Sequence, residues 1–232
     1  MIRGAFVLLL AASAGGPALA QPAGAIGRVE RVVVWGYGTA PGASARDLYE
    51  RQPVVANDAV ETVKDGALHL RFDDETRLRL GSQSKAVLDR FVYDPARGSG
   101  EMTIELGRGV FRFVSGRMDK RGYTLVTPTA TIGVRGTDFI VEVLESGETV
   151  VSVLEGLVAL RTRLLQLREI EVAAGEAGRT PADGGDPSKG ARGGLGNPIG
   201  DPGLRDDAGR GGGGGGAGGS GEGMGGGGGR GN

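Results

Sequence analysis

The sequence predicts an all-β protein, built as a sandwich, roll or solenoid of short strands. Apolar and polar residues alternate over stretches of about four to seven residues, as on strands with one buried and one solvated face. Glycine, proline or charged turns separate these stretches at roughly even spacing along the chain. Leu164–Val172 alone also fits a short helix, although its pattern suits a terminal strand as well.

The N-terminal segment, residues 1–20, has the layout of a secretory signal peptide. Arg3 gives a positive start, Ala5–Ala12 is apolar, and Ala18-Leu19-Ala20 offers a small-x-small cleavage site before Gln21. The apolar run is shorter than the roughly 20 residues that span a bilayer, and a buried N-terminal helix is the alternative. The sequence therefore predicts an exported protein, periplasmic or secreted, with no transmembrane segment in the mature chain.

Charge and composition exclude several classes of function. The formal net charge is −1, which gives no basic field to attract nucleic acid. The chain has no cysteine and a single histidine, His69, so we expect neither disulfides nor a transition-metal site. His69 falls on the polar face of its predicted strand beside arginines, which indicates a surface histidine rather than a ligand or a catalytic base.

The strands follow one another along the mature chain. Val29–Trp35 is a β-branched run that glycines and a proline end, and Asn57-Asp58 is a turn pair that tolerates positive φ. The clearest signal is a hairpin, because apolar residues alternate on both sides of Asp73-Asp74-Glu75. Further strands are predicted at 102–106, 110–114, 123–126, 130–134, 139–144, 149–154 and 157–160.

The acidic turn Asp73-Asp74-Glu75 has two interpretations. Clustered carboxylate oxygens are the ligands that calcium prefers. Neighbouring residues on a strand point to opposite faces, so few of these carboxylates can converge on one ion. A solvated hairpin turn is therefore the better interpretation.

A search for catalytic motifs gives no enzyme and no cofactor site. Gly36-Tyr37-Gly38 follows a strand, but Pro41 stands where a dinucleotide fingerprint needs its third glycine, and no helix pattern follows. A phosphate-binding loop and a GxSxG nucleophile elbow are both missing from the sequence. The sequence therefore predicts a non-catalytic protein.

One segment is far more specific than these motifs: it reads TPTATIGVRGTDF and covers residues 127–139. It resembles the core of the FecR domain, the periplasmic domain of regulators of ferric citrate uptake and of many stand-alone exported proteins. The Asn57-Asp58 turn, the hairpin around Asp74 and the Glu155-Gly156 turn match other parts of the family pattern in order. The resemblance covers residues 27–176 and implies a twisted β-roll or solenoid-like sandwich of about ten short strands.

The chain departs from the family at two turns and in its organisation. Asn57 and Glu75 stand where glycine is usual, which affects turn geometry. The iron regulators carry a cytoplasmic anti-sigma segment and a membrane span before this domain, whereas a cleavable signal and a glycine tail are predicted here. The chain is therefore not expected to relay a signal across the inner membrane by itself.

The motif supplies the candidate interaction residues: Thr127, Pro128, Arg135, Gly136, Thr137, Asp138 and Phe139. Alternation places Arg135 on the face opposite the aliphatic side chains, and Gly136 allows a bulge or bend. Arg135 and Asp138 either belong to a contact surface or brace the bend through a local ion pair, and the second reading is favoured.

We therefore expect a signal peptide at 1–20, an all-β domain at 21–181 and a disordered glycine-rich tail at 182–232. The expected function is that of an extracytoplasmic protein-interaction module, with a sensing or regulatory role and another envelope protein as partner. The alternative is a structural envelope or surface-matrix protein that binds wall material or polysaccharide.

Overall fold

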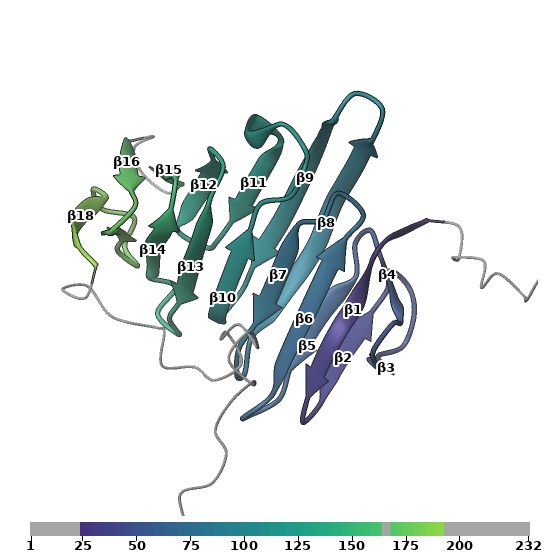
Figure 1. Cartoon of the computed structure of the whole chain (residues 1–232). Coiled ribbons are helices and arrows are strands. Elements are labelled where there is room, and N and C mark those ends of the chain that lie inside the picture. The colour runs from purple at the N-terminus through teal and green to yellow at the C-terminus, as the bar shows by residue number, and fades with distance from the viewer. Residues whose placement is uncertain (1–23, 164–167, 193–232) are drawn as a thin grey trace, which may run out of the picture.

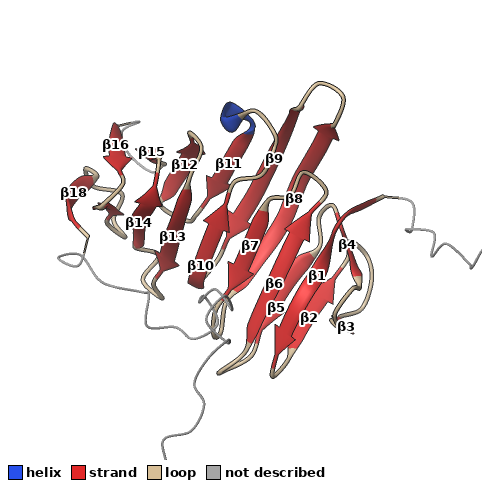
Figure 2. Cartoon of the chain, viewed as in Figure 1, coloured by secondary structure: helices blue, strands red, loops and turns tan. Residues whose placement is uncertain are grey.

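Apolar and polar residues alternate along the strands, so each sheet has one apolar face. The described residues form two nine-stranded sheets that pack face to face as a sandwich (Figures 1 and 2). The computed structural model describes residues 24–163 and 168–192. The predicted signal peptide and the glycine-rich run beyond residue 192 lie outside the described residues. The single helical element of the described part is a 3-10 turn, η1 (Lys120–Gly122). No helix in the described ranges is long and apolar enough to span a bilayer.

The strands of the first sheet, sheet A, are given in spatial order: β18 (Ser188–Ala191), β17 (Glu176–Thr180), β14 (Thr149–Glu155), β13 (Asp138–Val143), β10 (Gly109–Val114), β7 (Arg77–Leu80), β6 (Ala67–Phe72), β1 (Ala25–Val33) and β4 (Pro53–Val55). The second sheet, sheet B, runs in the same direction: β16 (Glu169–Ala173), β15 (Leu157–Thr162), β12 (Ala130–Val134), β11 (Tyr123–Val126), β9 (Ser99–Leu106), β8 (Lys85–Asp94), β5 (Ala59–Thr62), β2 (Gly36–Thr39) and β3 (Arg46–Asp47).

The chain advances along the sandwich by crossing repeatedly from one sheet to the other. Hairpins alternate between the layers: β6–β7 lies in sheet A, β8–β9 in sheet B, β13–β14 in sheet A and β15–β16 in sheet B. Strand pairs are antiparallel except for β9 and β11, which are parallel. Figure 1 shows this progression from the β1–β4 end to the β16–β18 end. The predicted solenoid-like sandwich is confirmed.

The core lies between the two sheets and is built from the inward-facing residues of every long strand. Three phenylalanines, Phe111, Phe113 and Phe139, are fully buried, and Phe113 contacts both Phe139 and Tyr123 through their rings. Among the described residues, the buried apolar side chains between the sheets form one continuous cluster. Burying one such side chain contributes about 1.5–3 kcal/mol to folding.

The described residues form 18 strands, more than the roughly ten that the resemblance implies. Some additional strands are short, such as β3 and β4, and carry little alternation. The long β8 has another cause, because its register shifts between Val87 and Arg90. Leu88 is buried before the shift, whereas Phe91 and Tyr93 pack against the core after it, so period two is broken in the sequence.

Two strands near the C-terminal end were not predicted as such: one lies in a segment that also fitted a helix, and the other in the predicted tail. In the segment that also fitted a helix, residues 169–173 form β16, which pairs with β15. β18 lies in the segment predicted as tail, and it pairs antiparallel with β17. An ion pair between Lys189 and Glu176, at 3.2 Å, joins these two strands.

His69 differs from the surface histidine that the sequence predicts. Its side chain does point away from the core, because its neighbours Leu68 and Leu70 are fully buried on the other face. It is nevertheless only 7% exposed. Its partners across the neighbouring strands are Arg31 and Arg79, and Arg79 is itself 9% exposed. Facing outward on sheet A therefore does not mean facing solvent.

A buried carboxylate ties the β6–β7 hairpin to the crossing between β10 and β11. Asp74 is fully buried, and its Oδ2 accepts hydrogen bonds from the Tyr123 hydroxyl at 2.6 Å and the Thr76 hydroxyl at 2.7 Å. Its backbone carbonyl accepts the Arg117 N–H at 2.7 Å, and the Gly116 N–H donates to Thr76 Oγ1 at 3.0 Å. These bonds hold sheet A, sheet B and the connection between them together.

The rest of the acidic turn points elsewhere. Asp73 is exposed, and Glu75 pairs with Arg71. The prediction of a solvated turn is therefore wrong for Asp74, because the Tyr123 and Thr76 hydroxyls replace water around its carboxylate. Glu75 and Asn57 adopt positive φ, 72° and 63°, as expected where the family carries glycine.

We expect Asp74→Ala to lower the free energy of unfolding by about 3 kcal/mol. The substitution leaves the buried Tyr123 and Thr76 hydroxyls without their acceptor. Urea unfolding followed by circular dichroism measures the effect, and Asp73→Ala is the matched control, with an expected change within about 0.5 kcal/mol. Equal effects of the two substitutions would contradict a structural role for the Asp74 carboxylate.

Alkaline pH should act on the same network. Burial, followed by the hydrogen bond to Asp74, raises the pKa of Tyr123 above its ordinary value of 10.0. The folded protein then holds the phenol proton more tightly than the unfolded chain, so stability falls as the pH rises above about 10. We expect Tyr123→Phe to flatten this fall in urea titrations between about pH 10 and 11. Tyr49→Phe removes an exposed phenol and should leave the slope unchanged.

Candidate functional site

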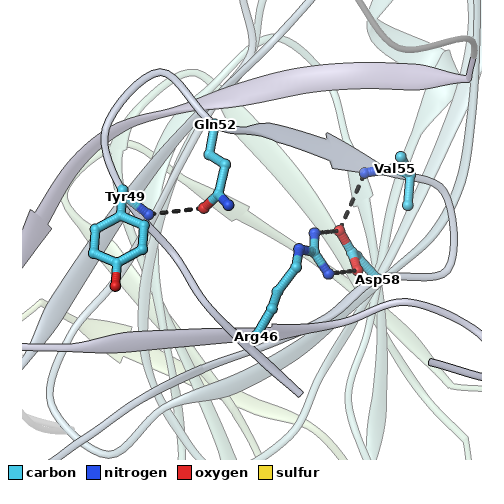
Figure 3. Close-up of polar contacts among 5 residues, drawn as sticks. All are labelled: Arg46, Tyr49, Gln52, Val55 and Asp58. Carbon is cyan, nitrogen blue, oxygen red and sulfur yellow. Dashed lines mark hydrogen bonds and ion pairs between the residues drawn. The ribbon is translucent and has the colours of Figure 1, made fainter. Parts of the chain in front are cut away.

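A buried ion pair fixes the segment that leads from β3 to β5. Asp58 is fully buried, and the Arg46 guanidinium donates to both of its carboxylate oxygens, at 2.9 and 2.5 Å (Figure 3). Asp58 also accepts the Val55 N–H at 3.2 Å, which closes the predicted Asn57-Asp58 turn. The hydrogen bond to Asp58 raises the pKa of Arg46, so the guanidinium stays charged.

Two further contacts hold the same segment against the sandwich. Leu48 is 2% exposed and reaches the core, and its N–H donates to the Gly36 carbonyl at 2.9 Å. The Tyr49 N–H donates to Gln52 Oε1 at 2.9 Å (Figure 3). Leu48 and Gly38 pack closely, because a Cβ at Gly38 would lie 2.9 Å from a methyl of Leu48. The two-residue strand β3 is therefore firmly positioned despite its length.

This segment and the start of β2 present exposed aromatic rings around one carboxylate. Trp35 is 44% exposed, Tyr37 39% and Tyr49 58%. Trp35 Nε1 donates to Asp47 Oδ1 at 2.9 Å, and the Tyr49 hydroxyl donates to Asp47 Oδ2 at 3.3 Å. Tyr37 lies directly opposite Asp47 in the β2–β3 pair. We call Trp35, Tyr37, Asp47 and Tyr49 the aromatic surface.

The composition of the aromatic surface is unusual for this chain. It holds the single tryptophan and two of the four tyrosines. Large rings bury much apolar area when a partner covers them, and Trp and Tyr are enriched among the residues that dominate binding energy. Val34 precedes Trp35 with φ 60°, a conformation that is costly for a β-branched residue. Backbone strain of this kind clusters at functional sites.

The aromatic surface combines exposed rings with one hydrogen-bonded carboxylate. Its carboxylate, Asp47, already accepts hydrogen bonds from Trp35 and Tyr49. Over residues 24–163 and 168–192, no group of three or more His, Cys, Asp or Glu side chains is placed to hold a metal ion. The arrangement suits a partner that offers apolar area together with hydrogen-bonding groups.

The sequence-predicted motif occupies the crossing from β12 in sheet B to β13 in sheet A. Phe139 is fully buried and Thr137 is 5% exposed, so both belong to the interior. Gly136 has φ 75°, which produces the predicted bend. Arg135 is exposed on the outer face of sheet B, where Arg121 and Arg161 line the same shallow depression.

Thr127 belongs to a buried threonine network at one end of the sandwich. Its hydroxyl contacts the Thr149 hydroxyl at 2.8 Å and accepts the Ala130 N–H at 2.9 Å. Thr129 contacts the hydroxyls of Thr149 and Thr180, at 3.0 and 3.1 Å. The network joins the β11–β12 turn of sheet B to β14 and β17 of sheet A, while Pro128 is exposed between its members.

Asp138 braces the crossing through a partner other than the predicted one. Its carboxylate accepts two hydrogen bonds from the Arg112 guanidinium, at 2.9 and 2.7 Å, and the two side chains are 16% and 15% exposed. The expected local ion pair with Arg135 is therefore wrong. The correct partner lies 26 positions earlier, on the adjacent strand β10.

The structure does not bring the seven motif residues together on one surface. Thr127, Thr137 and Phe139 point inward, whereas Pro128 and Arg135 are exposed. A contact role for the motif stays a prediction. The sequence pattern did not predict the aromatic surface, because Gly36-Tyr37-Gly38 indicated only the end of a strand and a dinucleotide motif that Pro41 excludes. The available signal was a lone tryptophan between a strand and a glycine-rich turn.

We expect Asp138→Ala to cost about 1.5–3 kcal/mol of unfolding free energy, because it removes a charge-assisted pair that is largely shielded from water. Arg135→Ala should change stability by less than about 0.5 kcal/mol, since that side chain is exposed. Thermal and urea unfolding monitored by circular dichroism distinguish the two. A larger loss for Arg135→Ala than for Asp138→Ala would contradict this assignment of the bracing pair.

Comparison with known proteins gives a family match that begins after the aromatic surface. Residues 58–159 match the family model described as FecR protein, and Asp58, the anchor of the aromatic surface, is the first matched residue. Comparison with the curated proteins gives no match.

Two crystal structures of a candidate anti-sigma factor from Parabacteroides distasonis ATCC 8503 are similar to this chain. They share 18% and 17% identity with it, each at a TM-score of 0.46, and the alignments cover 57% of this chain and 59% of that one. The matched residues of the family model contain the hairpin, the crossing motif and the Glu155-Gly156 turn that carry the sequence resemblance. Over residues 58–159, the chain is therefore similar to the FecR family.

Proposed function

We propose that this protein is a non-catalytic, extracytoplasmic FecR-domain protein that binds another envelope protein in signal sensing or regulation. In this proposal, residues 1–20 direct export, residues 21–181 form the binding domain, and residues 182–232 form a glycine-rich tail. The aromatic surface is the docking site, and its exposed Trp35 and Tyr49 are the observation that carries the proposal.

The composition of the surface favours a protein partner. Aromatic residues are enriched at protein interfaces, and the aromatic surface exposes three of them, Trp35, Tyr37 and Tyr49. Val34 adds an aliphatic side chain that is 63% exposed. An apolar protein surface can bury this side chain, whereas a polar sugar offers it little apolar contact. These features argue against the alternative, a structural protein that binds wall material or polysaccharide.

Rigidity adds to the affinity that such a surface can reach. Trp35 and Tyr49 are both tied to Asp47, and the Arg46–Asp58 pair and Leu48 hold the segment beneath them. A surface that is ordered before binding loses less conformational entropy on association. The FecR domain therefore acts as a scaffold that presents the rings in one arrangement.

We expect Trp35→Ala combined with Tyr49→Ala to reduce capture of the partner at least tenfold, the effect of losing about 1.4 kcal/mol or more of binding energy. In vivo crosslinking of the tagged, exported protein, followed by mass spectrometry, identifies and quantifies the captured protein. Val92→Ala is the control, since Val92 is also exposed, at 62%, but lies on β8. Circular dichroism should show unchanged folding in all variants.

Two outcomes would overturn the proposal. Equal capture by the wild-type chain and the double variant would remove the aromatic surface from the function. Recovery of wall material or polysaccharide, in place of a protein, would favour the structural alternative.

A further inference from the structure

A shallow depression on the outer face of sheet B is floored by residues with small side chains or none. Gly133 of β12 lies between Thr124 of β11 and Ala159 of β15 in the strand register. All three line the depression, which has a volume of about 210 Å³. The residues that flank each of them along its strand belong to the core between the sheets. The depression therefore opens away from the core.

Glycine at position 133 is not required by the packing of the sheet. A Cβ there would lie 3.7 Å from the Ala159 Cβ, which is an ordinary van der Waals contact, and Gly133 has no positive φ. Gly116 and Gly156 differ, since a Cβ at these positions would lie 2.2 and 2.0 Å from a backbone oxygen. Glycine inside a strand costs conformational entropy and often marks the close approach of a ligand or of another backbone. The nearest backbone atom would lie 3.9 Å from a Cβ at Gly133, so the space above it is free for a ligand.

The rim of the depression is cationic. Arg121 of η1, Arg135 after β12 and Arg161 of β15 line it, and Glu169 of β16 is the one carboxylate among the lining residues. Three positive charges therefore face one negative charge. The formal net charge of the whole chain is −1, so this excess of positive charge is a local property of the depression.

The protein itself neutralises these guanidinium groups only weakly. The Arg161–Glu169 and Arg121–Asp119 pairs are long, at 3.8 and 3.5 Å, and exposed ion pairs of this kind contribute little. Asp119 Oδ1 also accepts the Arg121 N–H at 2.9 Å and so caps η1. Arg135 is exposed, and none of the ion pairs or side-chain hydrogen bonds of the described residues involves it.

Lys120 adds a further positive charge beside Arg135. Its Nζ donates to the Gly116 carbonyl at 2.9 Å and to the Ser115 hydroxyl at 3.3 Å, and both of these acceptors are uncharged. Its side-chain carbons lie 3.3 Å from the position that a Cβ of Gly136 would take. Since Gly136 directly follows Arg135, positive charge gathers where β12 ends. An anion bound there would be stabilised by several cations at once.

We propose that this depression binds the carboxylate side chains of an acidic, extended segment of a partner protein. Guanidinium groups hold carboxylates through paired, charge-assisted hydrogen bonds, and the planar fork of arginine suits this geometry. Gly133 and Ala159 allow such a segment to approach the surface of the sheet closely. The depression is smaller than the roughly 300–1,000 Å³ of pockets that enclose small molecules, which favours side chains laid across it.

The inference goes beyond the proposed function and does not depend on it. The aromatic surface lies around β2 and β3, and β2 is five strand spacings, or roughly 24 Å, from β12 in the same sheet (Figure 1). The aromatic surface offers apolar area, whereas the depression selects for negative charge. Arg135 of the motif, which braces neither the bend nor the core, thereby gains a role.

Binding of a labelled hexaglutamate peptide to the full chain, followed by fluorescence anisotropy, tests the preference for carboxylates. A hexaglutamine peptide of the same length is the matched control. We expect hexaglutamate to bind and hexaglutamine not to bind measurably. The affinity for hexaglutamate should fall several-fold between about 50 and 300 mM salt, because ions screen exposed charges.

Charge variants locate the binding site. Arg121→Gln combined with Arg135→Gln should weaken hexaglutamate binding at least about tenfold. Arg77→Gln is the control, because Arg77 is also exposed on a strand but lies in sheet A, and its effect should stay within about twofold. The variant with Trp35→Ala and Tyr49→Ala should bind hexaglutamate as the wild-type chain does, so this test and that of the proposed function can fail separately.

Gly133→Val separates binding from folding. A β-branched residue suits a strand, and the space at Gly133 accepts a Cβ, so the urea midpoint should stay the same or rise. The valine fills the floor of the depression, so we expect the affinity for hexaglutamate to fall at least about fivefold. A purely structural role for Gly133 predicts the reverse, a lower urea midpoint with unchanged affinity.

Three results would overturn the inference. One is equal weakening by Arg77→Gln and by the Arg121 and Arg135 double variant, which would indicate attraction without a site. Another is unchanged affinity in Gly133→Val, which would remove the floor of the depression from the contact. The last is binding of dextran sulfate without binding of hexaglutamate, which would assign the depression to a sulfated polysaccharide in place of a protein.

Discussion

The hydrogen bonding of Asp74 is the constraint on which the rest of this sandwich depends. A carboxylate without exposure to water is costly unless its oxygens are satisfied, and here Tyr123 and Thr76 supply the donors. Tyr123 begins β11 of sheet B, whereas Asp74 lies in the hairpin of sheet A. The need to satisfy one charge therefore fixes the spacing of the two layers at the centre of the molecule.

The crossings between layers depend on glycine because the backbones come very close there. A Cβ at Gly116 would lie 2.2 Å from the Asp74 carbonyl oxygen, and one at Gly156 would lie 2.0 Å from the Gly136 carbonyl oxygen. Contacts of this kind leave room for no side chain. Glycine at these positions serves packing, and for the same reason Gly136 in the motif at 127–139 reports the fold more directly than it reports a binding site.

Sequence reasoning succeeded where a local pattern decides the structure. Alternation around the acidic turn predicted the hairpin of β6 and β7, because each residue there keeps its parity. It failed at β8, where a bulge after Leu88 changes which residues of the strand face the core. It also failed at His69, because the alternation gives the direction of a side chain but not its exposure to solvent. The Arg112–Asp138 pair was missed because its members are brought together only by strand pairing. Trp35 was overlooked because the exposure of an aromatic residue is a tertiary property.

The route of the chain along the sandwich has a mechanical consequence. The aromatic surface lies at the β2–β3 end, and the described chain ends beyond β18, some eight strand spacings or roughly 38 Å away. A pull between the two ends of the sandwich acts across the strands rather than along them. Backbone hydrogen bonds would then open one after another, as in a zipper, so the domain would lengthen stepwise under small forces. A sandwich built this way yields gradually to a pull between its ends.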